Sequence, residues 1–255
     1  MAIPLTASKA LRALRAEGLT VKQVGNWRTH NRNRQGRWGP VHGVILHHTG
    51  TRGTERTVEL CRDGRPGLPG PLCHAVIDKR GVVWLVGWGR TNHAGLGDPD
   101  VLGAVVCEQP LPADDEATVD GNPCFYGFEC VNLGDGYDPW PAAQVDAMVR
   151  ASAALLKAHG WGLDGDTSLI GHKEWQPGKP DPRGLDMREL RRRVAAMIRG
   201  AAAPPAPPSH GGGGGGGGGA PPPPPPSRPT LTDVDWWADI PTKSDKPSPG
   251  DYTWW

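Results

Sequence analysis

Two histidines and one aspartate, far apart in the chain, have the side chains that a catalytic zinc ion needs. His47 ends a short apolar run, and His172 and Asp181 flank one loop in the segment HKEWQPGKPD. Catalytic zinc usually takes three protein ligands from histidine, cysteine and carboxylate, and water takes the fourth position. The prolines and the glycine of the loop restrict its backbone, so it can present both residues in a fixed arrangement. These three residues predict a site for one Zn²⁺ ion.

Two other metal chemistries fit this spacing less well. The facial triad of non-haem iron oxygenases also uses two histidines and a carboxylate, but its first histidine and its carboxylate are close in sequence. His47 and Asp181 are far apart. The paired cysteines of the zinc deaminases are missing from the chain. A single histidine is more often structural or superficial than a ligand, so the prediction depends on the three residues together.

The polar candidates lie at the ends of apolar, β-branched runs, which predict buried strands. Strands are expected at 41–48, 74–78, 82–86, 125–133 and 168–171, and the short turn at 79–81 predicts a β-hairpin. Helical spacing predicts helices at 8–17, 141–159 and 186–199. The mixture predicts an α/β domain in which a central mixed β-sheet is flanked by helices.

The composition changes abruptly after residue 200. We expect one folded domain at 1–200, because residues 201–229 contain nine consecutive glycines and then six prolines and cannot form a core. This stretch predicts a flexible linker with a stiffer proline part. Residues 230–255 hold Trp236, Trp237, Trp254 and Trp255. We expect this tail to be disordered; stacking of its tryptophans on sugars or on a partner is the alternative.

Charge and cysteine content exclude some classes of protein. The 28 basic and 27 acidic residues nearly balance, so no nucleic-acid partner is expected. Four arginines of the last helix predict a solvated face, with a polyanion contact as the alternative: Arg188, Arg191, Arg192 and Arg193.

The five cysteines are odd in number and form no CxxC pair, which indicates a reducing compartment and leaves a partial disulfide set open. Neither a signal peptide nor a membrane-inserting stretch is recognised, so we expect a protein that is made soluble.

Five motifs occur in a characteristic order: GVILHHTG, CHAVIDKRGVVWLVG, NHAG, GFECVN and GHKEWQPGKPDPRG. Together, over residues 40–185, they resemble the type-2 N-acetylmuramoyl-L-alanine amidases. That family shares its fold with peptidoglycan recognition proteins and phage lysozyme-type amidases. Its members cut the amide between N-acetylmuramic acid and the first L-alanine of the peptidoglycan stem peptide.

The resemblance implies a role for each matching residue. His47, rather than His48, and His172 would bind zinc, and Asp181 holds the third position, which is a cysteine in some members. Glu129 would be the carboxylate that moves the proton from water to the leaving amine. Lys179 would stabilise the oxyanion, with a solvent-facing loop lysine as the alternative.

Three further residues are expected to contact the substrate: Thr49, His74 and His93. For His74, a hydrogen-bonded structural role is the alternative. Some members carry a tyrosine immediately before this histidine, whereas this chain has Cys73, so Glu129 is expected to carry more of the proton transfer. Cys130 follows Glu129 and, by strand alternation, should point away from the site.

An amidase of this kind without an export signal is expected to be a phage endolysin. It would act as a monomer on bacterial peptidoglycan, being made in the host cytoplasm and reaching the wall after holin-type release. A cytoplasmic enzyme that recycles muropeptides, and a non-catalytic module that binds peptidoglycan, are the alternatives. An intact set of metal ligands argues against the second alternative.

Overall fold

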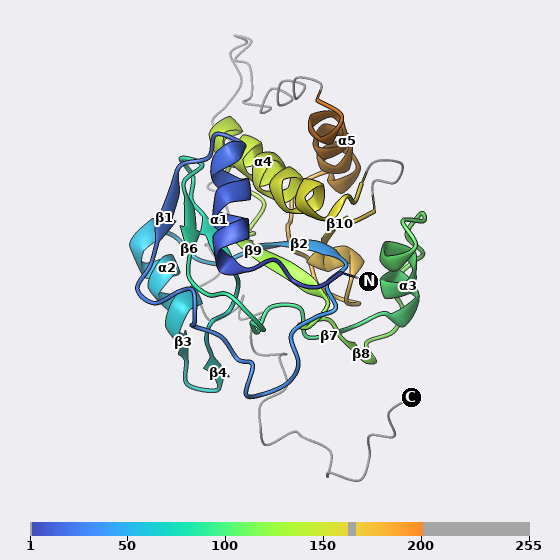
Figure 1. Cartoon of the computed structure of the whole chain (residues 1–255), viewed down its shortest axis with the longest axis horizontal. Helices are drawn as coiled ribbons and strands as arrows, with labels where there is room; N and C mark the ends of the chain where they lie inside the picture. The colour runs from blue at the N-terminus through green and yellow to red at the C-terminus, as the bar shows by residue number, and fades with distance from the viewer. Residues whose placement is uncertain (1, 163–166, 201–255) are drawn as a thin grey trace, which may run out of the picture.

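A six-stranded mixed sheet forms the centre of the protein, which is described by a computed structural model (Figure 1) over residues 2–162 and 167–200. Across the sheet the strands are β1 (Val21–Gln23), β6 (Val83–Leu85), β5 (Ala75–Ile77), β9 (Phe125–Cys130), β2 (Gly43–His48) and β10 (Leu169–Gly171). Within this sheet, as the structure describes it, only the β5–β6 pair is antiparallel. The α/β fold with a central mixed sheet is therefore confirmed, and so is the β5–β6 hairpin.

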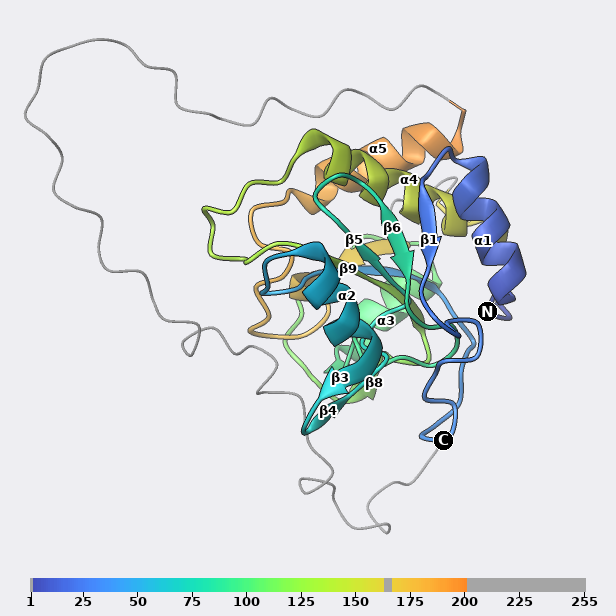
Figure 2. The ribbon, with the colours of Figure 1, turned by 90° about the vertical axis from the view of Figure 1, so that its left-hand side faces the viewer.

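The two faces of the sheet are covered by different helices. Figure 2 shows α4 (Ala142–His159) and α5 (Met187–Ile198) on one side, and their apolar residues join those of α1 (Ala7–Ala16) in the main core. Val44 and Leu46 of β2 face this core. The opposite face packs against α2 (Thr54–Asp63) and α3 (Pro99–Val106). Because side chains alternate along a strand, Ile45 and His47 belong to that opposite face.

Local signals in the sequence explain where several elements begin and end. The Thr6 hydroxyl accepts a hydrogen bond from the Lys9 N–H and caps α1. Pro141 precedes α4, and Gly160 ends it in the left-handed conformation with φ 73°. In the hairpin turn, Asp78 Oδ1 accepts hydrogen bonds from the backbone N–H groups of Arg80 and Val82. The predicted helices at 8–17, 141–159 and 186–199 are confirmed within one residue at each end.

Some elements differ from the expectation. The strand predicted at 125–133 ends at Cys130, because the chain then turns and the Asn132 amide donates to the Asp138 carbonyl. The short helices α2 and α3 were not predicted. Nor were β1 and two small ladders, which pair β3 (Gly64–Arg65) with β4 (Leu68–Pro69) and β7 (Leu96–Gly97) with β8 (Val119–Asp120).

The prediction of a solvated arginine face on α5 is wrong for Arg191 and Arg193, which are 7% and 2% exposed. The Arg191 guanidinium donates to both carboxylate oxygens of Glu174, at 2.8 and 3.0 Å, and to the Leu169 carbonyl. Glu174 Oε2 also accepts from the Gly171 N–H. This ion pair therefore braces α5 against the segment that carries His172.

The predictions about the cysteines and about membrane-spanning segments can be compared with the structure. All five cysteines lie in the described part of the chain and are free. Cys130 lies in the main core, so it points away from the face that carries His47, as expected. Of the helices in residues 2–162 and 167–200, none is long and apolar enough to cross a membrane. The linker at 201–229 and the tail at 230–255 lie outside the described residues.

Candidate active site

Two parallel strands bring the predicted metal ligands together at their carboxyl ends. Gly171, the last residue of β10, lies opposite Leu46 in β2, so the residues that follow them, His172 and His47, emerge side by side. His172 begins the short 3₁₀ helix η1 (His172–Glu174). The Lys173 N–H donates to the Asp181 carbonyl at 2.7 Å, which returns the loop to its starting point and places Asp181 beside His172.

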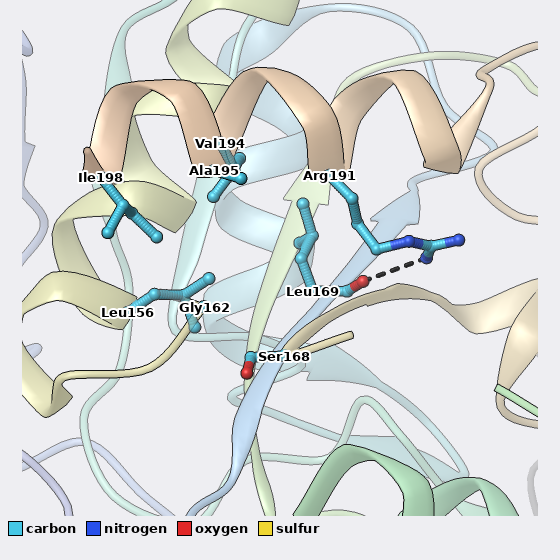
Figure 3. Close-up of a pocket in the computed structure, with 8 residues that line it drawn as sticks. All are labelled: Leu156, Gly162, Ser168, Leu169, Arg191, Val194, Ala195 and Ile198. Atoms are coloured by element: carbon cyan, nitrogen blue, oxygen red, sulfur yellow. Dashed lines mark hydrogen bonds between the residues drawn. The ribbon is translucent and has the colours of Figure 1, made fainter. Parts of the chain in front are cut away.

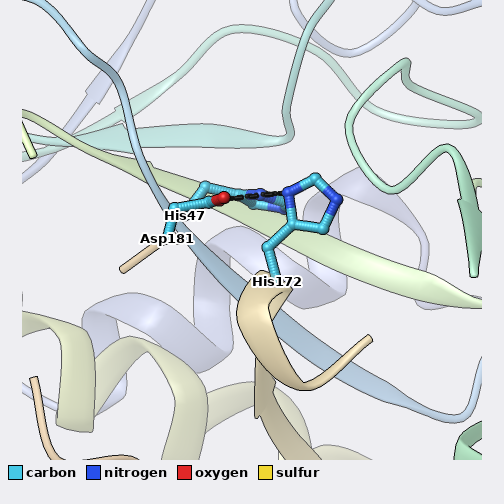
Figure 4. Close-up of side chains that lie close together, drawn as sticks. All are labelled: His47, His172 and Asp181. Carbon is cyan, nitrogen blue, oxygen red and sulfur yellow. Dashed lines mark hydrogen bonds and ion pairs between the residues drawn. The ribbon is translucent and has the colours of Figure 1, made fainter. Parts of the chain in front are cut away.

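The three side chains converge on one point (Figure 4). His47 Nδ1 lies 3.0 Å from His172 Nδ1, and both nitrogens lie 3.0 Å from Asp181 Oδ2. All three residues are buried, with exposed fractions of 0–1%. Tetrahedral zinc with bonds of about 2.0–2.1 Å separates its ligand atoms by about 3.3–3.4 Å. The observed triangle is therefore close to one face of a zinc coordination sphere, and the donor set fits the ion.

The protonation states of this cluster also suit a metal. Burial lowers the pKa of His47 to about 4, so its imidazole is neutral at pH 7. Burial alone would raise the pKa of Asp181, but the His172 and His47 rings beside it hold that pKa below its ordinary value. Metal ligation requires a neutral imidazole and an ionised carboxylate. The second oxygen of Asp181 is buried and finds no hydrogen-bond partner among residues 2–162 and 167–200.

His48, the neighbour that strand alternation alone could not exclude, lies outside the triangle. Its Nδ1 accepts a hydrogen bond from the Arg183 N–H at 3.0 Å. Its ring packs against Gly134, where any β-carbon would overlap it. His48 therefore holds two loops at the edge of the site, whereas His47 points into it.

Glu129 lies next to the cluster on the same face of the sheet. It is the register partner of His47 on the parallel strand β9, and it is completely buried. Within the described residues neither carboxylate oxygen has a hydrogen-bond partner. Burial, followed by the nearby Cys61 thiol and Asp181, raises the pKa of Glu129 well above its ordinary value. A buried carboxyl group without partners is costly for stability, and such groups are concentrated in functional sites.

Lys179 lies on the loop that joins His172 to Asp181 and is only 8% exposed. Its backbone N–H donates to the Gln176 carbonyl at 3.2 Å, within the turn that closes this loop. The alternative of a solvent-facing lysine is therefore wrong.

The sequence profile of the N-acetylmuramoyl-L-alanine amidases matches residues 37–184, which is more than half of the chain and includes every residue of this site. The chain belongs to this family. It is an N-acetylmuramoyl-L-alanine amidase, and its substrate is peptidoglycan. None of the curated proteins compared with it matches.

Solved structures with a similar arrangement are distant in sequence. An endolysin amidase, LysCS, from Clostridium intestinale is 16% identical, with 72% of this chain and 97% of that chain covered and a TM-score of 0.42. The amidase LysC from the same organism is 15% identical, with 72% and 99% covered and a TM-score of 0.43. The Ph2119 endolysin from a Thermus scotoductus bacteriophage is 18% identical, with 69% and 98% covered and a TM-score of 0.44. So distant a likeness decides nothing about the activity of this amidase.

The residues predicted to contact substrate are buried and use their polar atoms on the protein. His74 Nδ1 accepts from the Gly127 N–H and Nε2 donates to the Gly89 carbonyl, both at 2.9 Å, and burial lowers the pKa of His74 to about 3. The Thr49 hydroxyl contacts the backbone of Asn132. His93 lies against His47. For His74 the geometry favours the structural alternative, because both ring nitrogens are occupied.

Two polar residues of the amidase site were not predicted. Gln176 Oε1 lies 3.2 Å from His172 Nε2, and Asn122 Oδ1 accepts from the N–H groups of His93 and Ala94. The spacing of four residues between His172 and Gln176 is a signal that sequence inspection can use. Asn122 is remote from His93 in the sequence, and only the fold shows the contact.

A small pocket lies away from this site (Figure 3). It is found between α4, α5 and β10 and is lined by Leu156, Gly162, Ser168, Leu169, Arg191, Val194, Ala195 and Ile198. Leu156, Leu169 and Val194 belong to the core on the face opposite His47, and Ile198 packs against that core. Its one charged group, Arg191, is committed to Glu174 and the Leu169 carbonyl. The pocket therefore offers no free reactive group to the amidase.

Proposed function

We propose that this amidase is zinc-dependent and that His47, His172 and Asp181 hold one Zn²⁺ ion. The observation that carries the proposal is the buried triangle of two imidazole nitrogens and one carboxylate oxygen, each 3.0 Å from the others. Three protein ligands leave one position for water or substrate, as in other catalytic zinc sites. When bound, the ion acts as a Lewis acid that activates water and polarises a carbonyl.

Glu129 and Lys179 supply the remaining chemistry in this proposal. The Glu129 carboxylate takes one proton from the attacking water as the oxygen bonds to the lactyl carbonyl carbon. It then delivers that proton to the alanine nitrogen as the C–N bond breaks. The Lys179 ammonium stabilises the negative charge that develops on the carbonyl oxygen. The products are a free lactyl carboxylate on the sugar and a stem peptide with an L-alanine amino terminus.

The position of Glu129 supports its role. As the register partner of His47 it lies on the same face of neighbouring strands, and within the described residues neither of its oxygens has a hydrogen-bond partner. A carboxyl group with a raised pKa in a water-poor site is a stronger base when ionised than one in solvent. Cys73 stands where some family members have a tyrosine, and its thiol is completely buried, so Glu129 carries the proton transfer.

The test is mass analysis of purified peptidoglycan after digestion by the full-length chain. We expect release of stem peptides with a free L-alanine amino terminus, loss of that release after treatment with a strong chelator, and recovery on addition of zinc. Unchanged activity in the chelated protein, confirmed to be metal-free by elemental analysis, would contradict zinc dependence.

We further propose that the amidase acts as a monomeric phage endolysin, made in the host cytoplasm and released to the wall through a membrane pore. One chain supplies all three metal ligands, Glu129 and Lys179, so catalysis needs no second copy. The proposed linker and tryptophan-rich tail suit an enzyme that works on an extended wall better than one that recycles small muropeptides.

Expression in bacteria distinguishes these roles. Cells that contain the full-length chain are expected to grow until their inner membrane is permeabilised and then to lyse within minutes. The matched control is a chain in which Glu129 is replaced by glutamine. Survival after permeabilisation, together with cleavage of soluble muropeptides by the same preparation, would favour the recycling role.

A further inference from the structure

The imidazole of His93 lies directly behind His47, on the side away from the metal triangle. His93 Nδ1 is 3.1 Å from His47 Nε2, and His93 Nε2 is 3.2 Å from the Phe125 carbonyl. The two rings meet edge to face, with centroids 5.3 Å apart and an interplanar angle of 88°. His93 is 1% exposed, and both of its ring nitrogens are engaged by the protein.

The fold holds His93 in this position from two directions. Asn122 Oδ1 accepts hydrogen bonds from the N–H groups of His93 and Ala94, at 2.8 and 3.0 Å, and so fixes the backbone. Gly127 of β9 leaves room for the ring, because a β-carbon at that position would overlap the imidazole. The ring therefore fills a space that the sheet leaves open.

The contacts determine which nitrogens carry protons. A carbonyl oxygen can only accept, so the Phe125 carbonyl requires a proton on His93 Nε2. In a neutral imidazole the other nitrogen is then an acceptor, so His93 Nδ1 accepts and His47 Nε2 donates. His47 Nδ1 is left with a bare lone pair that points at His172 and Asp181.

The second metal-binding histidine has a similar arrangement. Gln176 Oε1, also an acceptor, lies 3.2 Å from His172 Nε2 and favours a proton there. The Nδ1 atoms of both histidines then face Asp181 Oδ2, and each of the three atoms can offer a lone pair to one cation. Such a cluster attracts a cation. The two supports differ in burial, because Gln176 is half-buried, whereas His93 is enclosed.

We infer that His93 is a positioning residue: it holds His47 in the tautomer and orientation that present Nδ1 to the metal, and it does not contact the substrate. This inference rests on the proposed zinc site. Groups that hold the second nitrogen of a metal-binding histidine typically change metal affinity by about 10- to 100-fold when they are removed.

Zinc binding to the full-length chain tests the inference through competition with a chromophoric chelator. His93→Leu removes the acceptor and is expected to weaken zinc binding by about 10- to 100-fold. His93→Asn is the matched rescue, because its amide oxygen can take the place of Nδ1 and accept from His47 Nε2; its affinity is expected to return close to the parent value. Urea denaturation of the metal-free proteins shows whether either variant changes the fold.

A second measurement determines the tautomer of His47 directly. Long-range ¹H–¹⁵N NMR spectra of the metal-free chain at neutral pH report the tautomer of each histidine. We expect His47 to be protonated at Nε2 in the parent and in His93→Asn, and to show a mixture of tautomers in His93→Leu. Protonation at Nδ1 in the parent would overturn the inference.

The outcomes separate the inference from the proposed function. A parent chain that binds no zinc would overturn the proposed metal site and, with it, the role of His93. A parent chain that binds zinc tightly, with His93→Leu folded and binding equally well, would overturn the role of His93 alone. Weak zinc binding by both variants would also overturn the inference, because an acceptor for His47 Nε2 would then not restore the affinity.

Discussion

Replacing Glu129 by glutamine is expected to lower kcat for peptidoglycan cleavage by about 10²- to 10⁴-fold, the usual contribution of a general acid–base residue. Glutamine has nearly the same shape but cannot take the proton from water. Zinc should remain bound at the parental stoichiometry, because Glu129 is not one of the three converging ligands. The measurement is the release of new amino termini from a soluble muropeptide, with zinc content determined on the same sample.

The control for this change is Glu59→Gln, which makes the same chemical substitution at an exposed position on α2. It should leave kcat unchanged. Because the Glu129 carboxyl group has no hydrogen-bond partner among the described residues, the glutamine breaks no such bond, and the variant should be about as stable as the parent. Parental activity in a zinc-loaded Glu129→Gln protein would show that another group transfers the proton.

Replacing Asp181 by asparagine is expected to remove zinc and reduce kcat/KM by about 10³-fold or more, because several kcal/mol of transition-state stabilisation depend on the ion. The change neutralises the one anionic ligand while keeping its shape. Asp115→Asn is the matched control, since Asp115 is exposed and remote from the triangle in the sequence. Elemental analysis after dialysis, together with the muropeptide assay, provides the measurement.

The variant Asp181→Cys tests whether Asp181 binds zinc or has only a structural role. A thiolate is a good zinc ligand, so this variant should retain zinc and part of the activity. A structural aspartate would not be replaced in this way. Equal loss of zinc in the asparagine and cysteine variants would contradict the assignment of Asp181 as a ligand.

Much of the candidate site could be predicted because metal chemistry restricts residue types strongly. Few side chains bind zinc, and a loop with His172 and Asp181 at its two ends is short enough to be recognised. Choosing His47 over His48 needed the family resemblance, because strand alternation gives the direction of each side chain only once the buried face is known. The substrate roles of Thr49 and His93 could not be judged from types and spacing, since burial decides what a polar side chain can reach.

Some elements of the fold could also be predicted from the sequence, and others could not. Long elements with a regular apolar pattern, such as α4, were predicted almost to their ends. The three-residue strand β1 has no such pattern, because it lies at the edge of the sheet and none of its residues is fully buried. Helix α2 contributes only Thr57, Val58 and Cys61 to the interior, too few for a recognisable period. Arg191 was misjudged because its partner, Glu174, lies on a different element.

The sequence by itself determined the α/β class, the metal-binding residue types and the family of this amidase, because these depend on local periodicity and on the chemistry of single side chains. Only the tertiary structure decided which polar groups meet. The convergence of His47, His172 and Asp181 and the support of His47 by His93 result from strand register in the sheet and from the loops that the sheet holds. The register also places Glu129 beside His47, without a side-chain hydrogen-bond partner among the described residues. Those relations join residues far apart in the chain, so no local pattern records them.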